Sequence, residues 1–331
     1  RAMTIPNSMF GEAIGQLYVQ KYFPEENKRY MVGLVENLRD ALGEHIRQLP
    51  WMSDETKAKA LDKLEALRVK IGYPDKWKDY SGIHVDPERP YVENVLEASR
   101  WFTRDNFSKL DKPVDKDEWF MTPQTVNAYY APSINEICFP AGILQPPYFD
   151  INVDDALNYG AIGVVIGHEM THGFDDQGRR FDKNGNLSNW WTDEDEANFK
   201  TLTAKLVEQF DAVEVAPGVH ANGTFTLGEN IADQGGLRVA LTAYRKNCKE
   251  SVSREIDGFP ALQRFYLSYA GVWASNIRPE EILSRTMSDP HSLARNRVNV
   301  TLRNIEPFFE AFYIKEGDEM YRPAEERVII W

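Results

Sequence analysis

The sequence predicts a mainly α-helical fold with a small mixed β-sheet, and three observations lead to this fold class. Apolar residues recur at the helical period through the N-terminal third and in long stretches after residue 155. β-branched and aromatic residues gather in two short runs between residues 119 and 139. A length of 331 residues with 42% hydrophobic residues favours about two domains and a sizeable core. We expect a helical segment over residues 1–115 and a second domain over residues 116–331.

The N-terminal segment is expected to contain several amphipathic helices. Residues 8–50 follow the helical period, and Pro24, which two glutamates follow, marks the start of a new helix within them. Ser53 is the expected N-cap of the next helix, whose apolar residues continue to Val69 and whose Lys and Glu side chains face outward. Residues 91–110 form a further amphipathic pattern after a polar link that prolines interrupt.

The rest of the chain is expected to combine one hairpin with further helices. Residues 125–130 and 136–139 have strand composition, and a turn region separates them. Asp154 and Asp155 begin the next helix, where acidic side chains suit the positive end of the helix dipole. Consecutive glycines at 235 and 236 indicate that their helix packs closely on a neighbour. Later helices are expected near residues 193–210, 227–244, 258–276 and 303–315.

Charge and hydropathy limit the partners of the chain. It carries 38 basic and 51 acidic residues, a formal net charge of −13, which disfavours nucleic acids and anionic membrane surfaces. The apolar run at residues 161–167 is much shorter than the roughly 20 residues that cross a membrane. We expect no nucleic-acid partner, no membrane contact from this segment, and a monomer.

One short stretch indicates a metal site, because His168, Glu169 and His172 form the pattern H-E-x-x-H. In a helix the two histidines lie four residues apart on one face, so both imidazoles can bind the same tetrahedral zinc ion. Glu169 lies beside the first ligand and is placed to take a proton from a metal-activated water. A catalytic zinc site also needs a third protein ligand and an open position for water.

Two residues further along the chain are candidates for the third ligand. The three-histidine variant of the motif is excluded, because Gly178 occupies the position of its third histidine. His220 lies in a loop rich in glycine and proline, whereas Glu229 begins a helix and has Asp233 four residues later on the same face. Glu229 is the better placed of the two. Asp233 could accept a hydrogen bond from one ligating imidazole, and Asp175, shortly after the motif, could do so from the other.

Several longer stretches, taken together, resemble the neprilysin / endothelin-converting enzyme family of zinc endopeptidases. The resemblance rests on VIGHE and THGFDD around the motif, GENIAD at residues 228–233, VNAYY at 126–130 and FPAGILQPP at 139–147. It extends over nearly the whole chain, from Met9 to Trp331. The resemblance implies a thermolysin-like catalytic domain over residues 116–331. It also implies that residues 1–115 are a linker and the remnant of a second, helical lobe.

The resemblance implies a role for each candidate residue. One zinc ion would be bound by His168, His172 and Glu229. The implied catalytic residues are Glu169 as general base, His291 as the group that stabilises the oxyanion, and Asp233, which together with Asp175 orients the imidazoles. The residues implied to bind the substrate are Asn127 and Ala128 on an edge strand, Arg297 at a substrate carbonyl, and an apolar pocket of Ile143, Tyr148, Val165, Val272 and Trp273.

The chain departs from the family pattern in two ways. Family members are longer by a large N-terminal lobe that covers the site, so this chain would be the C-terminal catalytic part. The chain ends at Trp331 without the cysteine that extracellular animal members have near this end, which favours a bacterial member. An extracytoplasmic location is expected.

The predicted function is zinc-dependent endopeptidase hydrolysis of oligopeptides, with a preference for an apolar residue after the cleaved bond. Two other interpretations remain open from the sequence. A zinc-stabilised module could bind peptides and cleave them poorly, and only turnover would distinguish it from an enzyme. A metallo-aminopeptidase would need acidic residues to hold a free N-terminus, and the sequence shows no motif for them.

Overall fold

The computed structural model describes residues 3–331 and begins with four helices. Pro24 stands at the N-cap of the third helix, and the Ser53 hydroxyl accepts a hydrogen bond from the Thr56 N–H at the start of the fourth. The helix starts predicted in this segment are therefore confirmed. The helices are α1 (Thr4–Met9), α2 (Gly11–Tyr22), α3 (Glu25–Gln48) and α4 (Asp54–Glu65).

The prediction was wrong at the end of α4. The helix ends at Glu65, and the chain then forms strand β1 (Arg68–Gly72), which pairs in parallel with β3 (Glu136–Pro140). Val69 and Ile71 are β-branched, and the edge of β3 offers them backbone hydrogen bonds that outweigh the helical period of the sequence.

The sheet is mixed, as predicted, with strand order β1-β3-β2. β2 (Tyr129–Ala131) pairs antiparallel with β3 and forms one edge of the sheet. It is shorter than the predicted strand, so placing Asn127 and Ala128 within a strand was wrong. A turn at residues 122–125 and a hydrogen bond from the Gly142 N–H to the Pro123 carbonyl direct the backbone here, and the two residues lead into β2 as irregular chain.

The helix that carries the H-E-x-x-H motif consists of three consecutive segments. α6 (Asp155–Asn158) begins after Asp154, whose carboxylate accepts a hydrogen bond from the Ala156 N–H. The chain continues through a π-helical segment, η1 (Tyr159–Gly163), into α7 (Val164–His172). Such π-segments inside α-helices often occur next to functional sites.

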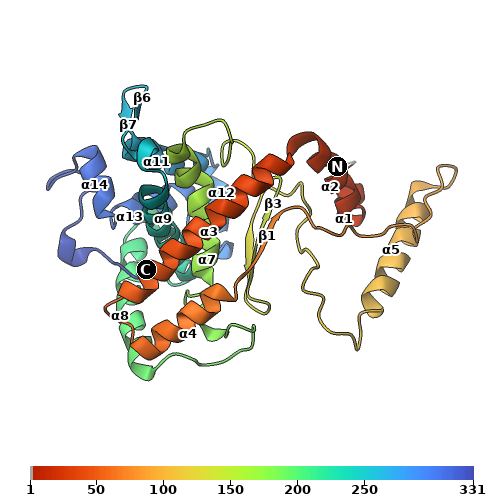
Figure 1. The fold of residues 1–331 in the computed structure, drawn as a ribbon, viewed down its shortest axis with the longest axis horizontal. Coiled ribbons are helices and arrows are strands. Elements are labelled where there is room, and N and C mark those ends of the chain that lie inside the picture. The colour runs from red at the N-terminus through yellow and green to blue at the C-terminus, as the bar shows by residue number, and fades with distance from the viewer. Residues whose placement is uncertain (1–2) are drawn as a thin grey trace.

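Helix α9 (Leu227–Asn247) crosses α7 at very short range (Figure 1). A Cβ on Gly236 would come within 2.6 Å of the His168 backbone nitrogen, and a Cβ on Gly167 within 2.8 Å of the Gly236 Cα. Only glycine permits such an approach, so the close packing predicted from the glycines of α9 is confirmed. The crossing brings the acidic residues at the start of α9 beside the histidines of α7.

The remaining helices agree with the prediction in part. The predicted helices at 91–110 and 193–210 are α5 (Tyr91–Phe107) and α8 (Asp193–Asp211). The C-terminal region differs: α12 (Pro279–Ser288) and α13 (Ala294–Leu302) were not predicted, since α13 buries polar side chains such as Asn296 and so lacks an apolar period. The other elements are η2 (Gly178–Arg180), β4 (Glu214–Ala216), β5 (Val219–His220), α10 (Lys249–Val252), β6 (Glu255–Ile256), β7 (Phe259–Pro260), α11 (Ala261–Val272), α14 (Glu306–Phe312) and η3 (Ala324–Glu326).

One hydrophobic core joins the N-terminal helices to the rest of the chain. α3 packs against both α7 and α9 and contributes fully buried side chains, Leu38 and Leu42 among them. α5 lies at the end of the molecule that is farthest from α8 and α14 (Figure 1), and its one buried residue is Ala98. The division of the chain near residue 115 stays a prediction. Within residues 3–331, none of the helices is long and apolar enough to cross a membrane.

Candidate active site

Helices α7 and α9 bring three possible metal ligands together. His168 and His172 project from α7, and Glu229 lies in the first turn of α9. The Nε2 atom of His168 lies 3.0 Å from Nε2 of His172 and 3.2 Å from Glu229 Oε2. The Nε2 atom of His172 lies 3.6 Å from Glu229 Oε1, and one ligand atom from each residue falls within 4.8 Å of the others.

A carboxylate stands behind each of the two imidazoles. Asp233 Oδ1 lies 2.9 Å from His168 Nδ1, and Asp175 Oδ2 lies 2.7 Å from His172 Nδ1. In the neutral form of each ring, the carboxylate accepts the Nδ1–H bond, and Nε2 then has a lone pair that faces the other ligands. Asp233 is 1% exposed and Asp175 is 5% exposed, so both hydrogen bonds are shielded from water.

The lone pairs of these three side chains repel one another unless a positive charge lies among them. Burial alone would lower the pKa of His168, but Asp233 and Glu229 raise it to about 10. Burial would raise the pKa of Glu229, yet its contacts with His168 and His172 hold that pKa well below its usual range. Within residues 3–331, the buried Oε2 atom of Glu229 has no hydrogen-bond partner. Two imidazoles and a carboxylate that demand a cation fit zinc.

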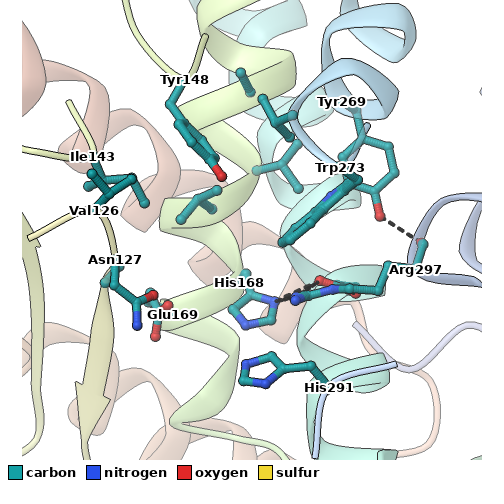
Figure 2. A pocket seen from close by; sticks show the side chains of 16 residues that line it. Val126, Asn127, Ile143, Tyr148, His168, Glu169, Tyr269, Trp273, His291 and Arg297 are labelled. Carbon is teal, nitrogen blue, oxygen red and sulfur yellow. Dashed lines mark hydrogen bonds and ion pairs between the residues drawn. The ribbon is translucent and has the colours of Figure 1, made fainter. Parts of the chain in front are cut away.

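Glu169 lies in the same turn of α7 and faces the pocket beside the three ligands (Figure 2). Its side chain is largely buried, with 8% of the residue exposed. Burial raises the pKa of this carboxyl, while the charges of His168 and His172 oppose the shift. A carboxylate whose pKa is raised in this way is suited to accept a proton and then release it.

His291 reaches the ligands from the loop between α12 and α13. Its Nε2 atom lies 3.3 Å from Glu229 Oε1, and its Nδ1–H donates to Asp289 Oδ1 at 2.8 Å. Arg285 donates two hydrogen bonds to the other oxygen of Asp289, at 2.9 and 2.7 Å. The His291 side chain is 43% exposed, so the bond to Asp289, rather than packing, fixes the direction of its ring.

Arg297 is buried and bound to the carboxylate behind His168. Its Nε and Nη2 atoms donate to the two oxygens of Asp233 at 2.7 and 2.6 Å. Its guanidinium carbon lies 3.9 Å from the centre of the Trp273 ring, and Tyr269 donates to its backbone carbonyl at 2.8 Å (Figure 2). Arg295, two residues earlier on α13, is exposed.

Two of the hollows that border the ligands also reach Asn127 and Ala128. The first has a volume of about 130 Å³, and the second, which also reaches Tyr130 and Asp175, about 360 Å³. The two hollows share Asn127, Ala128, His168, Glu169 and His291. The first is also lined by the apolar residues singled out from the sequence, Ile143, Tyr148, Val165, Val272 and Trp273, and by Arg297 (Figure 2).

His220, the other candidate for the third ligand, lies outside the metal-ligand cluster. It is exposed on β5, and its Nδ1–H donates to the backbone carbonyl of Asp211 at 2.9 Å. Among the His, Cys, Asp and Glu side chains of residues 3–331, the group that could hold a metal ion consists of His168, His172 and Glu229.

Sequence reasoning missed several residues around the site. Ala161, Val164 and Tyr269 also line the apolar pocket, and Arg285 supports His291 through Asp289. Only Asp289 had a local signal, because an aspartate often accepts the N–H of the residue two positions later, as it does here at 2.9 Å. Pocket residues from α11 and η1 have no such signal, because only the tertiary fold brings them together.

Comparison with known proteins identifies the family. Residues 127–328 match a family model of peptidase family M13, and residues 1–74 match a second model of the same family. The chain is 39% identical to a neutral endopeptidase of Lactobacillus helveticus, over all of the chain and 50% of that protein. It is 38% identical to neprilysin of Homo sapiens, over all of the chain and 46% of that protein. The chain belongs to peptidase family M13, and the predicted resemblance to the neprilysin family is confirmed.

Solved structures agree with this assignment. A zinc metalloprotease of Mycobacterium tuberculosis, solved with an inhibitor, is 44% identical with a TM-score of 0.91, over 98% of this chain and 50% of that chain. PepO from Lactobacillus rhamnosis is 36% identical with a TM-score of 0.89, over the same shares of the two chains. The predicted thermolysin-like fold class is confirmed. Bacterial and animal relatives are similarly identical to the chain, so a bacterial origin stays a prediction, and the chain spans about half the length of these relatives.

Proposed function

We propose that this chain is the catalytic part of a zinc-dependent endopeptidase that hydrolyses oligopeptides and binds one zinc ion. The observation that carries the proposal is the convergence of His168, His172 and Glu229 beside the carboxylate of Glu169. Structural zinc sites are usually closed by four protein ligands, whereas catalytic sites have three and keep a position open. Three ligands with a base and two hollows beside them support the catalytic alternative.

Zinc bound by these ligands would polarise the scissile carbonyl and lower the pKa of a water molecule to about 7. Glu169 would serve as the base that accepts a proton from the attacking water, because its carboxylate faces the pocket and is itself shielded from solvent. The raised pKa of Glu169 makes its carboxylate a stronger base for this step, and the leaving amine, which is more basic than a carboxylate, would then take the proton from it. Asp233 and Asp175 hold the two imidazoles in the tautomer whose Nε2 atoms face the metal position.

His291 is proposed to stabilise the oxyanion that forms at the scissile carbonyl. Asp289 accepts the Nδ1–H of its ring, so Nε2 is the nitrogen that faces the ligands and the substrate position. An N–H at this Nε2 would donate a hydrogen bond to the negative charge that develops on the carbonyl oxygen.

Substrate binding is proposed to use both hollows and the chain before β2. Asn127 and Ala128 border both hollows next to Glu169, so their polar groups can bind the backbone of an extended peptide. The apolar pocket of about 130 Å³ would take the side chain after the cleaved bond and favour an apolar residue there. Arg297, at the rim of this pocket, would bind a substrate carbonyl with a guanidinium N–H that Asp233 leaves free.

Other expectations accompany this proposal. The partners are oligopeptides, and the strongly negative chain is not suited to bind nucleic acid. A monomeric state, an extracytoplasmic location, and a catalytic domain over residues 116–331 after a helical segment over residues 1–115 all stay predictions.

The ligand set is tested by comparing Glu229→Ala with His220→Ala. Zinc affinity is measured for each folded variant by competition with a chromophoric chelator. Glu229→Ala removes one of three ligands and is expected to weaken zinc binding by more than the 10–100-fold typical of losing a residue behind a ligand. His220→Ala is expected to bind zinc like the unmodified chain, and the reverse ranking would contradict the ligand set.

The activity is tested on an internally quenched oligopeptide that is blocked at both ends. An endopeptidase cleaves this peptide, whereas an aminopeptidase needs a free N-terminus. Zinc binding and peptide binding without turnover would show that the chain is a binding module and would contradict the proposed function.

A further inference from the structure

Lys63 is the most deeply buried lysine side chain in the chain and takes no part in the chemistry described above. It lies on α4, which the sequence predicted to carry its lysines outward, yet the residue is 1% exposed. Its Nζ atom donates to three backbone carbonyls, those of Gly173 at 2.7 Å, Gly178 at 2.8 Å and Phe181 at 2.7 Å. The outward prediction for Lys63 was wrong, because these carbonyls satisfy the ammonium group in the interior.

The three carbonyls belong to the turn at residues 173–181, which directly follows the motif helix α7. Gly173 is the C-cap of α7 and comes immediately after His172, so Lys63 places a positive charge at the negative end of this helix. Gly178 folds back onto the helix so closely that a Cβ there would come within 1.7 Å of the His172 carbonyl oxygen. Lys63 therefore binds both ends of a tight turn that encloses the end of α7.

The same turn contains the carboxylate that orients His172. Asp175 Oδ1 accepts hydrogen bonds from the backbone N–H groups of Gln177 at 2.9 Å and Gly178 at 2.6 Å. Its other oxygen, Oδ2, is bonded to His172 Nδ1. Gly178 is thus held on both sides, by Lys63 at its carbonyl and by Asp175 at its N–H.

All three hydrogen bonds of the Lys63 Nζ atom go to carbonyls of this turn. Within residues 3–331, no carboxylate forms an ion pair with it, and aromatic rings of Tyr130, Phe174 and Trp190 lie 5.6–5.8 Å from its Nζ atom. Burial lowers the pKa of Lys63 to about 7, and the charges of Asp175 and Asp182 oppose this shift. The three carbonyl acceptors match the three N–H bonds of the protonated amine, so the geometry corresponds to the charged form.

We propose that Lys63 is a positioning residue for the metal site, which acts through the turn at residues 173–181 and Asp175 to fix the imidazole of His172. The proposal rests on the metal ligands assigned under the proposed function. It gives the N-terminal helices a direct role in the site, because a residue of α4 determines where the turn after the motif helix lies. Replacing a residue that supports a metal ligand from behind typically lowers metal affinity by about 10–100-fold.

The test replaces Lys63 by methionine, which has a similar length and no charge. Lys63→Met is expected to raise the zinc dissociation constant by about 10–100-fold, measured by chelator competition where circular dichroism shows the variant folded. At saturating zinc, kcat for the quenched peptide is expected to fall while KM stays unchanged, since the substrate contacts are intact. If Lys63→Met does not fold, Lys63→Gln, which keeps an N–H donor, replaces it in the same measurements.

Lys70→Met is the matched control. Lys70 is another buried lysine, 9% exposed, but its Nζ binds Glu136 at 2.9 Å and the Glu118 carbonyl at 2.7 Å, and it donates to none of the three carbonyls that Lys63 binds. Lys70→Met is expected to lower the melting temperature and leave the zinc dissociation constant unchanged. If Lys63→Met behaves in the same way, its role is only to stabilise the fold, and the proposal is overturned.

A double-mutant cycle tests the route through Asp175. If Lys63 acts through this carboxylate, Lys63→Met is expected to change zinc affinity much less in an Asp175→Asn background than in the unmodified chain. Fully additive effects would contradict the route. The unmodified chain separates the two proposals: if it binds no zinc, the proposed function fails, whereas normal zinc binding in both it and Lys63→Met overturns only the role of Lys63.

Discussion

The proposed metal-binding side and the proposed substrate-binding side of the site are built in different ways. His168, His172 and Glu229 project from two helices whose backbones touch at Gly167 and Gly236. Two of the groups proposed to face the substrate come instead from less regular chain: Asn127 precedes a strand and is exposed, and His291 lies in a loop with its side chain 43% exposed.

This difference indicates what each side must achieve. A metal site needs its ligands held within a fraction of an ångström, and rigid helices with hydrogen-bonded carboxylates behind the imidazoles provide this. A peptide-binding cleft must admit and release different chains, and groups carried by loops can adjust to them. Variants on the metal side should therefore change metal binding or abolish the chemistry, and variants on the substrate side should leave zinc in place.

The largest effect is expected for Glu169→Gln, which keeps the shape of the side chain and removes the base. The value of kcat should fall by about 10²–10⁴-fold, since general base catalysis contributes a factor of this size. Zinc content, measured on the same sample, should be unchanged because Glu169 is not a ligand. Glu250→Gln, the same substitution at an exposed glutamate of α10, serves as the control. Undiminished turnover in zinc-loaded Glu169→Gln would refute the assigned base.

An effect of intermediate size is expected for His291→Ala on the substrate side. Loss of one group that stabilises an oxyanion lowers kcat by about 10²–10³-fold. Zinc affinity should hardly change, because His291 only neighbours Glu229 at 3.3 Å. Arg285→Ala, which removes the support of Asp289, should give a smaller loss in the same direction. A large loss of zinc from His291→Ala would show that the two sides are not separate.

The smallest effect expected is a shift of the pH profile. Burial raises the pKa of Glu169 above the ordinary value of 4.5, and the base works only as the carboxylate. As the pH falls through this raised pKa, the base is lost, so the acid limb of kcat/KM should lie above pH 4.5. Zinc content is measured at each pH, so that loss of the metal is not mistaken for protonation of Glu169. An acid limb at or below pH 4.5 would contradict a raised pKa for Glu169 in the zinc-loaded chain.

The residues on the metal-binding side were easier to predict from the sequence than the residues on the substrate-binding side. His168, Glu169 and His172 lie within one helical turn, and Asp233 lies one turn after Glu229, so local spacing was enough to group them. The pairing of these two helices depends on the glycines of α9, which also gave a local signal. The conformation of the chain before β2 was harder to predict. Asn127 and Ala128 have strand composition, but the turn at residues 122–125 decides their conformation.

Contacts between residues far apart in the sequence account for the other places where the structure differs from the prediction. Residues 68–72 continue the helical period of α4, and only the edge of β3 turns them into a strand. Lys63 has the sequence context of a solvated helix face, and its burial depends on a turn more than a hundred residues later in the chain. α13 was missed because its buried side is polar and includes Arg297, which binds Asp233 across the site.

The most direct test of zinc-dependent hydrolysis measures metal content and turnover on one sample of this chain. The blocked, quenched oligopeptide is assayed before metal removal by a chelator, after removal, and after zinc is added back, with zinc quantified at each stage. We expect one zinc ion per chain, loss of turnover with the metal, and recovery with zinc. Turnover that persists in zinc-free protein, or its absence from fully zinc-loaded protein, would contradict the proposed function.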